Sequence, residues 1–265
     1  MIQFADLFPD EQIVVTLSRQ LSWSHFVSII PIKDPLSRDF YAEMCKLESW
    51  SVRQLRKSID SMLFERVAIS KQPETMIRKE FDLVKTGEIS PGFVMKDPYF
   101  LDFLGLKQAY SENDLEMAIL REMEAFLLEL GAGFTFVARQ KRMIIDGEDF
   151  HLDLLFYHRK LHRLIAIELK LGKFKAAYKG QMELYLRWLD KYERAHQEES
   201  PLGIILCAVK GKETVDLLEL GESGIHVAEY FTELPSKDIL VAKLDRSIKE
   251  AREKYNIPLI EDKQA

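Results

Sequence analysis

Cysteine, glycine and proline are scarce in this sequence of 265 residues, which contains only 2, 12 and 9 of them. So few glycines and prolines exclude a collagen-like or low-complexity chain. The two cysteines, Cys45 and Cys207, are far apart, and Cys207 lies in the apolar run IILCAV. We therefore expect Cys207 to be a buried thiol and expect no disulfide framework, which suits a reducing compartment such as the cytoplasm.

Long apolar runs are missing as well. None reaches the roughly 18 residues that a membrane-spanning helix needs. The first residues, MIQFADLFPDEQ, have no basic stretch followed by an apolar one, so no secretory signal is visible. We expect a cytoplasmic protein without a membrane partner. The composition, 47% hydrophobic and 30% charged, provides enough apolar surface for a core, and the net charge of −6 taken alone argues against nucleic acid.

The first half of the chain, residues 1–107, is predicted to be an all-helical domain. Apolar residues recur there at three- and four-residue spacing, which predicts helices. These helices are expected over 22–30, 36–49 and 51–69. Asp34 or Ser37 could cap the second helix, and Ser51 the third. Residues 85–100 have little periodicity and contain two prolines and two glycines, which indicates a linker or irregular loop.

The second half, residues 108–235, alternates between helical and strand-like segments. A long amphipathic helix is expected over 111–131, capped by Ser111 or Asn113. The segments that follow are strands at 134–138, 152–158 and 164–169, a helix at 176–195, a strand at 202–209, a helix at 212–220 and a strand at 224–231. The order α-β-β-β-α-β-α-β predicts an α/β domain with a mixed sheet flanked by helices. Residues 236–265 are expected to form a C-terminal helix.

Two charged residues, Glu168 and Lys170, end the apolar segment LIAIELK. Side chains two apart on a strand share a face, so these two lie in one row. The other row is wholly apolar and must face the core; it consists of Ile165, Ile167 and Leu169. A Glu and a Lys at the end of a mostly buried strand are costly unless they have a function.

The preceding strand contains a third charged residue, Asp153. If residues 159–162 form a four-residue hairpin loop, His158 pairs with Arg163 and Asp153 lies directly opposite Glu168. Two carboxylates this close on one sheet face repel each other unless a cation lies between them. A buried salt-bridge network is the structural alternative.

Two carboxylates, a backbone carbonyl and waters make a typical Mg²⁺ site. Asp153, Glu168 and the carbonyl of Leu169 are therefore candidate ligands for Mg²⁺ or Mn²⁺. Such an ion lowers the pKa of a bound water and stabilises a pentacovalent phosphate. Lys170 could orient the attacking water or neutralise the phosphate.

Gln181 and Tyr185 stand at positions i and i+4 of the next expected helix and therefore share one face. Packing of this pair against the sheet is the alternative to a role in the site. His151 is more simply a hydrogen-bonded strand residue than a metal ligand. No P-loop, nucleophile-elbow or zinc-ligand spacing occurs in the sequence, so ATP-driven, serine-hydrolase and zinc chemistry lack support.

Asp153 followed by Glu168-Leu-Lys170, within this order of elements, resembles the PDDEXK nuclease superfamily. The segment Gln181-Met-Glu-Leu-Tyr185 is similar to the QxxxY motif of its RecB-type members. The resemblance implies a restriction-endonuclease-like core in which these residues are catalytic. Leu152 precedes Asp153 where the superfamily often has proline.

A longer stretch, residues 126–175, resembles the YhcG family of PDDEXK nucleases. Residues 21–26 and 40–60 are similar to the N-terminal domain of that family, which is thought to be a nucleic-acid binder of winged-helix type. The superfamily often adds an acidic residue from its first helix, and the matching position here is Glu116, with Glu122 as the competitor. The resemblance thus implies Glu116 as an additional metal ligand.

Charge supports a nucleic-acid partner once it is counted locally. Between Arg139 and Lys179 there are ten Lys and Arg against five Asp and Glu, a net charge of +5, so the rest of the chain carries −11. A positive strip beside a metal site suits a phosphodiester substrate. The candidate nucleic-acid contacts here are Arg139, Lys141, Arg142, Lys173, Lys175 and Lys179. In the helical half, Arg53, Arg56 and Lys57 fit the exposed side of a recognition helix or an ordinary solvated face.

These features predict a Mg²⁺- or Mn²⁺-dependent nuclease that hydrolyses DNA phosphodiester bonds, with the helical domain positioning the nucleic acid. RNA is a further candidate substrate. A homodimer is compatible with the prediction, because cutting two strands requires two sites. The alternative function is a non-cleaving DNA-binding or assembly module that keeps a nuclease fold.

Overall fold

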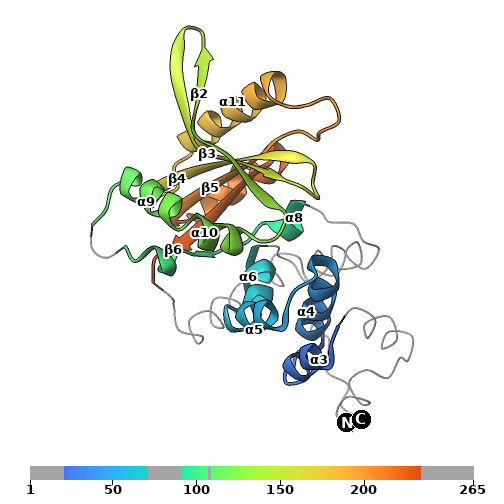
Figure 1. Ribbon diagram of the computed structural model, residues 1–265. Helices are drawn as coiled ribbons and strands as arrows, with labels where there is room; N and C mark the ends of the chain where they lie inside the picture. Colours follow the sequence, from blue (N-terminus) through green and yellow to red (C-terminus); the bar gives the residue numbers. More distant parts are fainter. Residues whose placement is uncertain (1–20, 71–90, 107–108, 234–265) are drawn as a thin grey trace. The chain divides into compact units, whose positions relative to one another are not determined.

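The computed structural model describes residues 21–70, 91–106 and 109–233 (Figure 1). The chain separates into two compact units, with a boundary after Ser90. The first unit contains α3 (Trp23–Ile29), α4 (Pro35–Glu48), α5 (Val52–Asp60) and α6 (Leu63–Ser70). Among the described residues 21–70 no strand occurs, so this part is all-helical as expected.

Local capping decides where these helices begin. The Asp34 side chain accepts a hydrogen bond of 2.7 Å from the backbone N–H of Ser37 and starts α4. Ser51 starts α5 through a capping box with Gln54. The single helix expected over 51–69 is instead two helices, because Met62 adopts a left-handed φ of 53° between α5 and α6.

The α4–α5 pair is joined by only three residues, as in a helix-turn-helix. His25 of α3 fastens this turn, since its Nε2 lies 2.9 Å from the carbonyl oxygen of Trp50. Trp23 begins α3 and is 52% exposed, although the centre of its ring lies 6.5 Å from that of the buried Phe26. The winged-helix type of this unit stays a prediction, since residues 1–20 and 71–90 lie outside the described part.

The second unit is built on a mixed six-stranded sheet with the order β1-β6-β5-β4-β3-β2. Its strands are β1 (Tyr99–Phe100), β2 (Phe134–Ile145), β3 (Glu148–His158), β4 (Arg163–Lys173), β5 (Leu202–Val209) and β6 (Ile225–Phe231). The pairs β2–β3 and β3–β4 are antiparallel, and the other neighbours are parallel. The parallel pairs β4–β5 and β5–β6 need crossovers, which α11 (Ala177–Tyr192) and α12 (Lys212–Leu217) provide.

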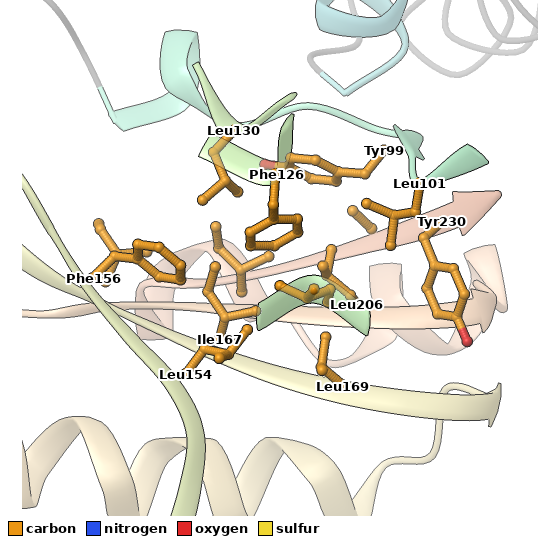
Figure 2. Close-up of a cluster of buried hydrophobic side chains, with 14 of the residues drawn as sticks. Tyr99, Leu101, Phe126, Leu130, Leu154, Phe156, Ile167, Leu169, Leu206 and Tyr230 are labelled. Carbon is orange, nitrogen blue, oxygen red and sulfur yellow. The ribbon is translucent and has the colours of Figure 1, made fainter. Parts of the chain in front are cut away.

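Helices cover both faces of this sheet (Figure 1). On one face, α9 (Glu112–Arg121) and α10 (Met123–Leu130) bury a cluster that includes Phe126, Phe156 and Ile167 (Figure 2). On the other face, α11 buries a second cluster through Met182 and Leu186. We call these the α9–α10 face and the α11 face. The predicted α/β class with flanking helices is therefore confirmed.

The apolar row expected on β4 lies on the α9–α10 face, with Ile165, Ile167 and Leu169 fully buried. Cys207 is also fully buried, and both cysteines are free thiols. None of the helices in the described ranges is both long and apolar enough to cross a membrane.

Two expectations on either side of the boundary at residue 107 are wrong. The helix expected over 111–131 is broken at Glu122, whose φ of −103° and ψ of 33° end α9 before α10 begins. The segment 85–100 is not wholly a loop, because α8 (Pro91–Val94) and β1 lie within it and β1 pairs with β6. β1 therefore belongs to the sheet, on the far side of the expected boundary at residue 107. The extents of the domains stay a prediction, and the C-terminal helix expected over 236–265 lies outside the described residues.

Candidate active site

The four-residue loop expected between β3 and β4 is present, and its register is the predicted one. His158 pairs with Arg163, and the ladder continues to Leu154 opposite Ile167. Beyond this pair, the backbone N–H groups of the two strands donate to side-chain carboxylates and no longer to backbone carbonyls. The backbone N–H of Asp153 donates to Glu168 Oε1 at 3.3 Å, and the N–H of Leu169 donates to Asp153 Oδ2 at 2.9 Å. The two acids are therefore adjacent where the strands part.

In both strands of the β2–β3 hairpin, the regular alternation of side chains between the two sheet faces is interrupted near Gln140 and Asp153. Leu152 and Leu155 pack in one cluster on the α11 face, although residues three apart on a regular strand point to opposite faces. On β2, Gln140 has a left-handed φ of 45°, which costs a non-glycine residue roughly 1–2 kcal/mol. Its neighbours pair with Leu154 and Leu152, so Gln140 lies opposite Asp153.

Gln140 links the strand acid to the first helix of the unit. Its Nε2 donates to Asp153 Oδ1 at 3.2 Å and to Glu116 Oε2 at 2.7 Å. Glu116 lies on α9 and is 6% exposed. The predicted first-helix acid thus reaches Asp153 through an amide, whereas Glu122 is exposed at the break between α9 and α10.

Lys170 completes the cluster from β4. Its Nζ lies 2.9 Å from Glu168 Oε2 and 5.4 Å from the centre of the Tyr178 ring. The side chains of Lys170 and Glu168 are 12% and 4% exposed, so the pair is largely shielded from water. Its shielding makes the interaction stronger than a surface ion pair.

The electrostatics of this cluster favour an added cation. Burial and repulsion from Asp153 raise the pKa of Glu168 to about 7, although Lys170 acts in the opposite direction. Burial also raises the pKa of Asp153, against the N–H of Leu169 and the charge of Lys170. For Lys170 burial lowers the pKa, but attraction to Glu168 outweighs it and the pKa is raised overall. A protonated lysine facing two carboxylates leaves an excess negative charge.

The donor set fits a divalent metal ion that prefers oxygen ligands. No group of three or more His, Cys, Asp or Glu side chains within the described residues is arranged to hold a metal. Asp153 and Glu168 provide two carboxylates, and Mg²⁺ commonly uses one or two while keeping several waters. A buried salt-bridge network is the structural alternative, because a proton on Glu168, whose pKa is raised to about 7, would balance the charges of Lys170 and Asp153.

Gln181 and Tyr185 meet on α11 as their spacing predicts. Gln181 Nε2 donates to the Tyr185 hydroxyl at 2.8 Å, and that hydroxyl lies 3.5 Å from the carbonyl oxygen of His151. Tyr185 is buried, and its pKa is raised first by burial and also by Glu168 and Asp153 nearby. The pair therefore anchors α11 to β3 two residues from Asp153. Packing and a functional role are both compatible with this position.

The basic residues predicted to contact nucleic acid differ in whether they already form ion pairs or hydrogen bonds within the protein. Lys141 forms an ion pair of 2.7 Å with Glu193, and Arg142 one of 2.6 Å with Asp149. Lys179 donates to the Leu218 carbonyl at 3.0 Å and lies 3.7 Å from Glu183. Arg139 is exposed and contacts the sulfur of Met117. Of the candidates, Lys173 and Lys175 in the site's unit and Arg53, Arg56 and Lys57 on α5 are also exposed, and like Arg139 they have no ion pair among the described residues.

Two residues of the site were missed from the sequence. Glu112 on α9 accepts from the backbone N–H of Leu171 at 3.2 Å and acts on the charges of Lys170 and Asp153. Gln140 carries no motif, but the turn at Asp146-Gly147 places it opposite Asp153 once β2 is extended to that turn. The strand expected from the sequence covered only 134–138, so it did not include Gln140 and could not predict its position opposite Asp153.

Comparisons with known proteins agree with the geometry. A model of the YhcG PDDEXK nuclease domain matches residues 93–247, and a model of the DUF1016 N-terminal domain matches residues 1–66. The chain is 36% identical over 244 residues to the Escherichia coli (strain K12) protein named "Putative nuclease YhcG". The match covers 91% of this chain and 64% of that protein, so the chain spans less than two thirds of its relative's length.

Solved structures that match include a repair endonuclease from Pyrococcus abyssi and EndoMS in a complex with double-stranded DNA. Their sequence identities are 22% and 18%, and their TM-scores are 0.33 and 0.35. Each match covers 49% of this chain and 50% or 49% of the other chain. The family assignment rests on the sequence matches, which extend over both halves of the chain: the chain belongs to the YhcG family of PDDEXK nucleases.

Proposed function

We propose that this protein is a divalent-metal-dependent nuclease that hydrolyses phosphodiester bonds of DNA. The observation that carries the proposal is the meeting of Asp153, Glu168 and Lys170 where the β3–β4 ladder ends. This arrangement places oxygen donors and one ammonium group at the same point. Phosphodiester hydrolysis needs both, because negative charge develops on the phosphate while water attacks it.

Asp153, Glu168 and the Leu169 carbonyl would hold Mg²⁺ or Mn²⁺, with Glu116 supporting Asp153. When bound, the ion lowers the pKa of a coordinated water and neutralises charge on the phosphate. Lys170 retains its proton and therefore donates hydrogen bonds to the attacking water or to a phosphate oxygen, rather than acting as a base. Gln181 and Tyr185 shape the α11 side of the site.

The function is tested by incubating the full chain with supercoiled, linear, single-stranded and branched DNA and with RNA. Each substrate is combined with Mg²⁺, with Mn²⁺ or with EDTA. We expect DNA products only when a divalent ion is present. Cleavage of RNA alone would overturn the assignment of DNA. Tight binding with no product on any substrate would favour the alternative, a non-cleaving DNA-binding or assembly module.

Lys173 and Lys175 lie just after the site, exposed at the end of β4 and before α11. Replacing both by Gln is expected to weaken DNA binding in EDTA and to reduce the slope of log affinity against log salt by about 1.8, or 0.9 for each lost phosphate contact. Arg142→Gln is the comparison, because its charge is already paired with Asp149 and should contribute less. An unchanged salt slope in the double variant would contradict this DNA path.

The same proposal places the protein in the cytoplasm, which its two buried free thiols support. The exposed basic face of α5, with Arg53, Arg56 and Lys57, is proposed to help position the nucleic acid. A homodimer is proposed only for double-strand cutting, which requires two sites.

A further inference from the structure

Gln140 combines two unusual features that the proposed reaction does not by itself require. It holds a left-handed backbone conformation within a strand, and its amide is shared between two carboxylates from different elements. Strained backbone of this kind persists only where the surrounding contacts enforce it, and it occurs often at functional sites. Glycine or asparagine would adopt this φ more easily, so the glutamine side chain must provide something that offsets the strain.

The side-chain contacts show what that is. A glutamine amide nitrogen has two hydrogens, and here one is directed to Glu116 and the other to Asp153. Both oxygens of Asp153 thereby receive a donor, since Oδ2 accepts from the N–H of Leu169. Each carboxylate oxygen still has a free lone-pair direction. Asp153 is thus fixed in orientation while it keeps the capacity to bind a cation.

Glu116 depends on the same contact. It is 6% exposed, and Gln140 is the hydrogen-bond donor that the structure gives to its carboxylate. Without a shared donor, two carboxylates brought together across the α9–β3 gap would repel each other. A neutral amide can donate to both carboxylates and leave their negative charge available to a cation, whereas an Arg or Lys in its place would neutralise part of that charge.

We propose that Gln140 is a positioning residue for the metal site, which clamps Asp153 and Glu116 together so that Asp153 presents its carboxylate to the ion. The inference rests on the proposed function for its metal. It assigns a role to a residue that lies outside the family motifs. It also explains why the side chains of β2 and β3 change sheet face at this position. The amide acts through the two acids and does not touch the reacting atoms.

The test compares Gln140→Met, which keeps the length of the side chain without its donors, with Gln140→Gly, which also relieves the backbone. Asp146→Gly is the matched control, since Asp146 has a left-handed φ of 51° at the exposed tip of the same hairpin. Mn²⁺ affinity is measured by calorimetry on metal-free full chain, together with thermal unfolding and DNA binding in EDTA. We expect both Gln140 variants to bind Mn²⁺ about 10- to 100-fold more weakly, as supporting residues of metal ligands do.

Their cleavage rates should recover towards wild type at saturating Mn²⁺, and their DNA binding in EDTA should be unchanged. Asp146→Gly should behave as wild type in every assay. Unchanged Mn²⁺ affinity in a folded Gln140 variant would overturn the proposal. Should Gln140→Met fail to fold, the glycine variant decides, because it removes the amide and the backbone strain together.

A double-mutant cycle separates clamping from general structural support. In a Glu116→Gln background, Gln140→Met should weaken Mn²⁺ binding by no more than about twofold, because the clamp has already lost one end. A full additional loss there would show that Gln140 does not act through Glu116. A wild-type chain that binds Mn²⁺ but cleaves no nucleic acid would refute the nuclease function, while the affinities would still decide the role of Gln140.

Discussion

Asp153→Asn is expected to reduce metal-dependent cleavage by about three orders of magnitude, as loss of one charged member of a catalytic set does in other enzymes. Asp153 faces Glu168 across the parted strands, and its two oxygens are held by Leu169 and Gln140. Asparagine keeps the shape but loses the charge that a divalent cation requires. We therefore expect Mn²⁺ binding, measured by calorimetry, to be lost together with activity.

The Asp153→Asn substitution should lower activity without lowering the stability of the metal-free protein. Because burial raises the pKa of Asp153, its ionised form costs free energy in the metal-free fold, and the amide removes that cost. The variant should unfold in EDTA at the wild-type temperature or above it. Asp149→Asn, the same change on an exposed part of β3, is the control and should keep full activity. An Asp153 variant with near-normal cleavage would exclude this carboxylate from the mechanism.

Lys170→Met is expected to slow cleavage by about 10²- to 10³-fold, which is the cost of removing one stabilising donor from an active site. Its ammonium group is held against Glu168 and next to the ring of Tyr178. Removing a positive charge beside a cation site should leave Mn²⁺ affinity equal or higher. The distinguishing result is therefore intact metal binding with lost turnover, the reverse of the Asp153 pattern.

The substitution also leaves Glu168 without its ion-pair partner. Breaking a buried pair in this way costs about 3 kcal/mol or more of stability in other proteins, so thermal unfolding is measured with and without Mn²⁺. We expect Mn²⁺ to restore most of the lost stability, because it replaces the missing positive charge. Lys191→Met on the exposed side of α11 is the control. Full activity of Lys170→Met would remove this lysine from the reaction.

The part of the site that could be predicted is local along the chain. A four-residue hairpin loop sets the register of β3 and β4, so the meeting of Asp153 and Glu168 follows from their distances to that loop. The Gln181–Tyr185 contact follows in the same way from helical spacing. Short connections leave few alternative pairings, which is why sequence spacing is informative here.

Other parts depend on contacts between distant segments. The parallel pairing of β1 with β6 joins Tyr99 to Tyr230, and nothing in the irregular segment 85–100 signals it. The reversal of β2 and β3 at Gln140 needs packing on both sheet faces and the two carboxylates that hold the amide. The position of Gln140 in the site is identified by the groups around it in the folded protein and not by the fact that it is a glutamine.

The scarcity of glycine and proline excluded a low-complexity chain, and the alternation of helical and strand-like segments in the second half determined the α/β class. The motif spacing determined which acids and which lysine come together, because strand and helix periods are fixed by backbone geometry. Only the tertiary structure decided how they are held. It raises the pKa of Glu168, brings the Gln140 amide into hydrogen-bonding distance of Glu116 and Asp153, and pairs Lys141, Arg142 and Lys179 with groups of the protein. Burial and partner geometry are set by elements that approach one another in space, and local sequence does not encode that approach.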